Sequence, residues 1–333
     1  MKLNKIFTSH MVFPASVPVR IYGEGSGNVK ISFAGHSVAE SFDCANWLIE
    51  LPPMEYGGPY EMKVNLNGEE QILADIYIGE VFLFSGQSNM QFKLGDSTTP
   101  KERYESTGNL RFFVADRLEE GEPYSSNDGW IVSNADIAGS FSALAYLVSQ
   151  EFSEKNNIAV GALCCYQGAS VIESWVPAGA FKKIGINLLP EQKRPAHYCK
   201  EYSAWNGEGC LYENMLSQVT PYPVSAVVWY QGEADATYEE GKVYAKELAL
   251  LIDIWRRDFK NPGLPFVIVQ LADFESGCAD LEGWKRVQQA QMEIIDNSSN
   301  VKSVKCADIC ENFDLHPPTK DKLAHRIAEA LSN

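Results

Sequence analysis

The chain has 333 residues, of which 45% are hydrophobic and 22% are charged, an ordinary composition for a soluble globular protein. This composition excludes a mainly disordered chain. Lysine and arginine number 28 against 44 aspartate and glutamate, and the resulting net charge of −16 argues against a nucleic-acid partner. No apolar run reaches the roughly 18 residues that a membrane span requires, so no membrane partner is expected.

The N-terminal segment Met1–Phe13 opens with two lysines, but polar residues interrupt its apolar stretch and no small-residue cleavage site follows. We therefore expect a cytoplasmic protein, or an exported one if a signal has been removed. A length of 333 residues predicts two domains, or one large domain with an appendage, at about 150 residues per domain. No oligomeric state is predicted.

Eight cysteines are too dilute for a disulfide scaffold. The adjacent Cys164 and Cys165 lie in an apolar run and are expected to be small buried hydrophobic residues. Cys306, Cys310 and His316 have no second cysteine pair beside them, so we do not expect a zinc site. No metal and no cofactor is predicted.

Residues 1–78 have the pattern of a small antiparallel β-sandwich. Pro18–Tyr22, Asn28–Phe33 and Tyr60–Asn65 alternate apolar and polar residues, and Gly- and Asn-rich turns separate them. The glycines of Gly23–Asn28 precede a strand-like segment rather than a helix, which indicates a hairpin turn and not a phosphate-binding loop.

Residues 79–333 alternate apolar runs with helical patterns, which predicts a parallel sheet covered by helices on both faces. Ligands of such sheets bind beyond the carboxyl ends of the strands, so chemistry is expected just after each run. The runs are 81–84, 110–114, 158–163, 226–230, 266–271 and 301–305, and the helical stretches are 139–155, 238–259, 283–296 and 319–331.

The first run is followed by Ser85-Gly-Gln-Ser-Asn-Met90. Gly86 allows a tight turn from strand to helix, and Ser88 would then stand at a helix N-terminus, where free N–H groups meet developing negative charge. That position suits a nucleophilic serine whose own N–H helps to hold an oxyanion. The alternative is an N-cap serine. The Gly-x-Ser-x-Gly elbow is absent, because Met90 replaces its second glycine.

Two later runs end in polar segments that offer further candidates. Gly168 either turns a backbone N–H toward the site or is a turn glycine. Trp175 either lines a sugar pocket or belongs to the core. The Gln231 side-chain amide is a candidate oxyanion donor. Glu233 and Asp235 are a possible glycosidase pair, although residues two apart do not normally face each other across a bond, and Glu233 could instead order its loop.

The last run is followed by Phe313-Asp-Leu-His-Pro-Pro318. His316 is the candidate base, because it is the only one of five histidines with an acid at this spacing at the end of a strand. Asp314, two residues away, lies on the same side of an extended segment and can orient the ring. The two prolines stiffen the loop.

Three motifs in this order, Gly86–Met90, Trp229–Glu233 and Asp314–Pro317, resemble the sialate O-acetylesterase family. That family belongs to the SGNH (GDSL-like) hydrolase superfamily and is related to acetyl xylan esterases. The resemblance implies a flavodoxin-like α/β/α sandwich with a parallel sheet, preceded by the N-terminal β domain. It also implies a carbohydrate O-acetylesterase that removes acetyl groups from sugars through a serine acyl-enzyme.

The resemblance also implies roles for single residues. Ser88 would be the nucleophile, His316 the general base and then acid, and Asp314 its orienting partner. The backbone N–H groups of Ser88 and Gly168 and the side chain of Gln231 would hold the oxyanion. Substrate contacts are expected from Gln87, Asn89, Trp175 and Glu233.

Two segments depart from the family pattern. Where relatives have Gly-Gly, this chain has Gly168-Ala169, so either N–H could serve the oxyanion. Many relatives have Leu-Tyr-Asn-Gly-Met-Ile before the third strand. This chain has Leu211-Tyr-Glu-Asn-Met-Leu216 there, so a substrate contact of that asparagine is not carried over. The acetylated sugar is therefore open between sialic acid, xylan and another glycan, and a non-catalytic carbohydrate-binding protein on the same fold is an alternative.

Overall fold

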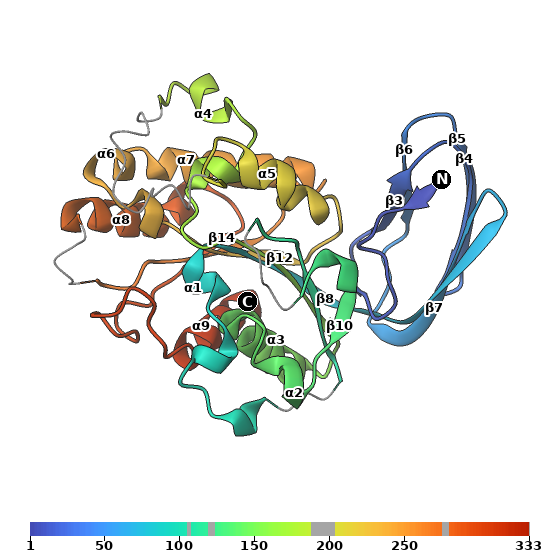
Figure 1. Ribbon diagram of the computed structural model, residues 1–333, viewed down its shortest axis with the longest axis horizontal. Coiled ribbons are helices and arrows are strands. Elements are labelled where there is room, and N and C mark those ends of the chain that lie inside the picture. The colour runs from blue at the N-terminus through green and yellow to red at the C-terminus, as the bar shows by residue number, and fades with distance from the viewer. Residues whose placement is uncertain (105–107, 119–123, 188–203, 275–279, 333) are drawn as a thin grey trace.

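The computed structural model describes residues 1–104, 108–118, 124–187, 204–274 and 280–332. Figure 1 shows a central sheet with helices on both faces and the N-terminal strands beside this body. The fold is a mixed α/β fold, which confirms the predicted class at this level. None of the helices within these ranges combines the length and the apolar character that crossing a bilayer requires.

The central sheet has the strand order β10-β9-β11-β8-β12-β13-β14. Neighbouring strands are parallel except β9 and β10, which pair antiparallel, so the sheet is mixed. With β9 and β10 set aside, the remaining strands follow the order 2-1-3-4-5 along the chain. The strands are β8 (Glu69–Gly86), β9 (Leu110–Val114), β10 (Trp130–Val132), β11 (Val160–Tyr166), β12 (Ala226–Tyr230), β13 (Phe266–Val269) and β14 (Val301–Val304).

Each of the six apolar runs forms a strand of this sheet, as predicted. The reason is two-sided burial: every residue of β11 and of β12 is buried, so both faces of these strands have to be apolar. The short β10 was not predicted. β8 lies at the centre of the sheet, between β11 and β12. Its carboxyl end, at Gly86, is therefore in the middle of the edge formed by the strand ends.

Helices α3 and α9 pack against each other on one face of the sheet, and α7 and α8 lie on the other (Figure 1). The predicted helix at 238–259 is broken into α6 and α7. In α9, Leu323 and Ile327 are buried four residues apart, as the pattern predicts. The helices are α1 (Ser88–Gln91), α2 (Ala135–Ala138), α3 (Ala143–Asn156), α4 (Ala180–Lys183), α5 (Cys210–Asn214), α6 (Tyr238–Gly241), α7 (Tyr244–Asp258), α8 (Leu281–Asn297) and α9 (Asp321–Ser332). Short 3₁₀ turns occupy η1 (Leu94–Asp96), η2 (Lys101–Arg103), η3 (Ser126–Asp128), η4 (Ile172–Trp175), η6 (Leu216–Gln218) and η7 (Glu233–Asp235).

The N-terminal strands form two groups. β1, β3 and β6 make an antiparallel three-stranded sheet, while β4, β5 and β7 join the first half of β8. β8 continues past residue 78: its residues 69–78 pair with β7, and its residues 80–86 pair with β11. One strand therefore links both regions. The strands are β1 (Lys2–Leu3), β2 (Val12–Pro14), β3 (Val19–Glu24), β4 (Gly27–Phe33), β5 (His36–Phe42), β6 (Asn46–Leu51) and β7 (Gly57–Leu66).

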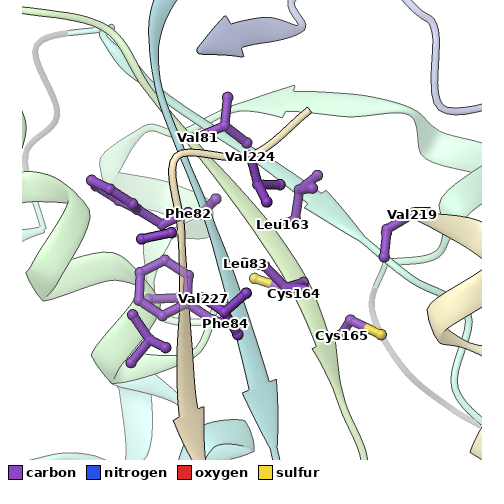
Figure 2. Packing of buried hydrophobic residues seen from close by; sticks show 14 of the residues in the cluster. Val81, Phe82, Leu83, Phe84, Leu163, Cys164, Cys165, Val219, Val224 and Val227 are labelled. Carbon is purple, nitrogen blue, oxygen red and sulfur yellow. The ribbon is translucent and has the colours of Figure 1, made fainter. Parts of the chain in front are cut away.

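Buried side chains of the central strands hold the helices on the sheet. Figure 2 shows Phe82 and Phe84 of β8 among these side chains, and the Phe82 ring meets Phe152 of α3 at 5.0 Å between centroids. Cys164 and Cys165 of β11 are buried free thiols, as predicted. Their burial raises the pKa of Cys164 to about 12, so this thiol is an inert hydrophobic group at neutral pH.

Candidate active site

The turn from β8 into α1 presents Ser88 at the centre of the sheet edge. Gly86 has φ +135°, and a Cβ there would lie 2.0 Å from the Tyr230 carbonyl oxygen, so only glycine fits. The Gln87 N–H then donates to that same carbonyl at 3.0 Å. Ser88 is the first residue of α1, where backbone N–H groups lack intrahelical acceptors. The N-cap reading of Ser88 is wrong, because Gln87 is the N-cap residue of α1 and no side chain caps this helix, while the nucleophile role stays a prediction.

The loop after β14 brings His316 to Ser88. The His316 Nε2 atom lies 2.7 Å from the Ser88 Oγ atom, across 228 residues of sequence. Burial lowers the pKa of His316 below its usual 6.5, and the nearby positive charge of Lys320 lowers it further, while Asp314 opposes both. The ring is therefore neutral at pH 7 and can accept a proton from the serine hydroxyl.

Asp314 lies on an exposed part of this loop. Its influence on the pKa of His316 is electrostatic, and within the described ranges no hydrogen bond joins its carboxylate to the ring. Phe313 and Leu315, its neighbours, are 75% and 41% exposed. The orienting role of Asp314 remains a prediction.

Gly168, in the turn after β11, lies against the nucleophile. A Cβ on Gly168 would stand 3.8 Å from the Ser88 Cβ atom. Side chains of residues 205 and 206 fix this turn. The Gly168 carbonyl accepts from Trp205 Nε1 at 3.0 Å, and the Ala169 carbonyl accepts from Asn206 Nδ2 at 2.8 Å. Neither Ser88 nor Gly168 donates its backbone N–H to another residue of the described ranges. Within these ranges the backbone N–H groups of Ser88 and Gly168 thus have no protein acceptor.

Gln231 does not fit the predicted oxyanion role. Its side chain is fully buried, and its amide nitrogen donates to the Ser170 carbonyl at 2.9 Å and to the Asp235 carboxylate. Its amide oxygen accepts from the Tyr244 hydroxyl at 2.9 Å. Both N–H groups of the amide are used inside the protein, so none is left for a substrate oxygen.

Trp175 is a core residue, the second of its two readings. Its side chain is 0% exposed and packs edge-on against Trp229 and Trp255. Its indole N–H donates to the Ser170 hydroxyl at 3.0 Å. An aromatic ring enclosed in this way has no face open to a sugar, so the predicted substrate contact does not fit.

The other predicted substrate contacts, Gln87, Asn89 and Glu233, hold loops of the site together. The Gln87 side-chain oxygen accepts from the backbone N–H groups of Gly232 and Ala234. The Asn89 amide donates to Glu233 Oε1 at 2.7 Å. Gln87 and Asn89 are both almost fully buried, so their roles are internal.

Asp235, the possible partner of Glu233 in a glycosidase pair, is buried. Its carboxylate accepts from the Ile172 backbone N–H and from the Gln231 amide. Burial raises the pKa of Asp235 well above its usual range, and the neighbouring carboxylates raise it further. A carboxyl group engaged in this way does not face a sugar, so the pair lacks the geometry for glycoside hydrolysis.

Lys320 was not predicted from the sequence. Its side chain is 0% exposed, and its Nζ donates to Asn89 Oδ1 at 2.8 Å. Burial lowers the pKa of Lys320 to about 8, and burial raises the pKa of Glu233 to about 7. The only signal was a lysine four residues beyond His316, just before the last helix.

Among the residues that the structure describes, no group of three or more His, Cys, Asp and Glu side chains could hold a metal ion. The site combines a hydroxyl, a neutral imidazole and backbone N–H groups without a protein acceptor in the described ranges, beyond the carboxyl ends of parallel strands of the mixed sheet. Nucleophilic catalysis at an ester carbonyl uses groups of these types.

The chain belongs to the family described as "Carbohydrate esterase, sialic acid-specific acetylesterase", whose model matches residues 78–333. This confirms the family that the three motifs indicated. The sialate O-acetylesterase of Homo sapiens is 25% identical over 324 residues, which covers 84% of this chain and 59% of that protein. The Rattus norvegicus sialate O-acetylesterase is also 25% identical, over 84% of this chain and 62% of its own length. The chain thus spans about three fifths of these relatives.

Two solved structures support the fold. A carbohydrate acetylesterase from Xanthomonas citri superposes with a TM-score of 0.85 and 26% identity, over 99% of this chain and 74% of that one. A protein from Arabidopsis thaliana superposes with a TM-score of 0.51 and 20% identity, over 76% of this chain and 98% of its own. The first likeness extends through the N-terminal strands.

Proposed function

We propose that this chain is a carbohydrate O-acetylesterase with Ser88 as nucleophile and His316 as general base. The observation that carries the proposal is the 2.7 Å contact between His316 Nε2 and Ser88 Oγ, in a chain of the acetylesterase family. The substrate is a sugar that bears an acetyl ester. The proposal includes the flavodoxin-like α/β/α sandwich at 79–333 and the N-terminal β-sandwich at 1–78, supported by the strand order 2-1-3-4-5 and by the two groups of N-terminal strands.

The reaction follows from the positions of these groups. Ser88 Oγ attacks the acetyl carbonyl carbon while His316 Nε2 takes the hydroxyl proton. The carbonyl oxygen becomes an oxyanion, which the free N–H groups of Ser88 and Gly168 stabilise; each such donor contributes about 3 kcal/mol. The bond to the sugar oxygen breaks as His316 returns the proton to it. Water then attacks the acetyl carbon while His316 takes its proton, the bond to Ser88 Oγ breaks as His316 returns that proton to Oγ, and acetate leaves.

A panel of esters tests the proposal. Acetate release is measured from O-acetylated sialic acids, acetylated xylo-oligosaccharides and p-nitrophenyl acetate, with and without EDTA. We expect release from at least one acetylated sugar and no effect of EDTA, because serine and histidine need no metal. Release from xylo-oligosaccharides alone would assign an acetyl xylan esterase. No release from any ester, and no labelling of Ser88 by a fluorophosphonate, would instead support a non-catalytic carbohydrate-binding protein.

The pKa of His316 predicts the acid limit of activity. The base works only when its ring is neutral, and burial and Lys320 lower its pKa below 6.5. Protonation, and with it loss of the base, is therefore expected only as the pH falls through a value below 6.5. NMR titration of the ring signals, assigned with His316→Gln, measures this midpoint. A midpoint at or above pH 6.5 would contradict the electrostatics of the site.

A further inference from the structure

A buried side-chain amide connects three loops beneath the candidate nucleophile. Asn89, the residue after Ser88, is 2% exposed. Its Nδ2 donates to Glu233 Oε1 at 2.7 Å and to the Leu315 backbone carbonyl at 2.9 Å, and its Oδ1 accepts from Lys320 Nζ at 2.8 Å. Both N–H groups and the oxygen of the amide are used. Asn89 is thus satisfied by the loop after β12, the His316 loop and the residue before α9.

The bond to Leu315 joins the two chemical groups of the site through their neighbours. Asn89 adjoins Ser88, and Leu315 adjoins His316, so this bond fixes one backbone segment relative to the other. The Phe313 and Leu315 side chains are 75% and 41% exposed, so they contribute little packing to the loop. Farther along the loop, the Pro318 carbonyl accepts from the Thr98 N–H at 3.1 Å. The Asn89 bond therefore acts closest to the base.

Charges on either side fix the direction of the amide. Lys320 faces the amide oxygen, and Glu233 faces the amide nitrogen. A flipped amide would turn its N–H groups toward the Lys320 ammonium and its oxygen toward the Leu315 carbonyl, two repulsive contacts in a buried place. The observed direction is the one that leaves an N–H pointing at Leu315.

We propose that Asn89 is a positioning residue, whose amide holds the His316 loop at hydrogen-bond distance from Ser88 while Lys320 and Glu233 fix the direction of that amide. This inference rests on the proposed roles of Ser88 and His316. In this proposal Asn89 and Glu233 position the His316 loop and do not make the substrate contact that the sequence predicted. A displacement of about 1 Å between reacting groups can lower a rate about 100-fold, so a loss of this bond should be visible in kcat.

The test uses Asn89→Asp and Asn89→Ala with p-nitrophenyl acetate, which has no sugar. Asn89→Asp keeps the oxygen that faces Lys320 but loses both N–H donors. We expect kcat to fall about 100-fold in both variants with KM within about threefold, since the acetyl group binds elsewhere. Asn127→Asp, the same change at an exposed turn, serves as the control and should be unaffected.

A second pair keeps the test decisive if the Asn89 variants do not fold. Glu233→Gln retains a side-chain oxygen that accepts from Asn89, whereas Glu233→Leu does not. We expect kcat of the glutamine variant to exceed that of the leucine variant about tenfold, both proteins having the far-ultraviolet circular dichroism of the wild type. Equal kcat values in this pair, or Asn89 variants within threefold of wild type, would overturn the positioning role.

Failure of the inference can be told from failure of the proposed function. If Asn89→Asp lowers activity toward acetylated sugars but not toward p-nitrophenyl acetate, Asn89 contacts the sugar and the positioning role is wrong. If Ser88→Ala stays active, the nucleophile assignment is wrong, and with it the basis of the inference.

Discussion

Ser88→Ala is expected to lower kcat for acetyl ester hydrolysis by about 10⁴- to 10⁶-fold, the loss typical of serine hydrolases without their nucleophile. The variant keeps the N–H groups of Ser88 and Gly168 and the neutral ring of His316. It loses the oxygen that forms the acyl-enzyme, and water has to replace it. Initial rates with p-nitrophenyl acetate and acetate release from the best sugar of the panel measure the effect.

The fold should tolerate this change. Ser88 is only partly buried, and the hydrogen bond that its side chain makes within the described ranges is the one with His316. We expect a free energy of unfolding within about 0.5 kcal/mol of the wild type. Ser41→Ala, a change at an exposed serine of β5, is the matched control for activity. Full activity in Ser88→Ala would show that another group is the nucleophile.

Gly86→Ala is expected to destabilise the protein by at least about 3 kcal/mol and to remove activity. The residue has φ +135°, a region that side chains other than glycine enter only at a cost of about 1–3 kcal/mol. The added Cβ would also lie 2.0 Å from the Tyr230 carbonyl oxygen and 2.6 Å from its carbon. Since this is backbone of a central strand, β8 and β12 would have to separate where Ser88 begins its turn.

Gly35→Ala separates these two effects. Gly35 has φ +84° in the turn between β4 and β5, and a Cβ there would meet no atom within 4 Å. Only the backbone strain remains, and about 1–2 kcal/mol is expected. Urea unfolding of both variants gives the difference that the contact with Tyr230 causes. Equal losses of stability would contradict the close packing of Gly86 on β12.

The strands illustrate how far local patterns reach. A strand covered on both faces needs apolar residues throughout, so runs such as 160–166 and 226–230 were recognisable without neighbours. The first and last residues of helices were predicted less accurately than the strands, because a single capping residue decides where a helix begins. α3 begins only at Ala143, after Ser142, whose hydroxyl accepts from the Ala145 N–H. At 242–243 the predicted helix is interrupted between α6 and α7.

The residues of the candidate site also fall into those that the sequence could predict and those that it could not. Ser88, Gly168 and His316 follow strands in the chain, and parallel strands bring their carboxyl ends to one edge, so their meeting could be predicted. Gln231 and Trp175 could not be assigned, because residue type does not tell whether an amide or an aromatic ring is satisfied internally. Both are enclosed by neighbours from other segments, Ser170 among them.

The amino-acid order alone thus determined the family, six strands of the central sheet and the two residues whose side chains meet. Packing alone decided that Lys320 is buried against Asn89 and that Asp314 stays in solvent. The reason is physical: periodicity and motif are properties of neighbours along the chain, whereas burial and hydrogen-bond partners depend on segments that are far apart in it.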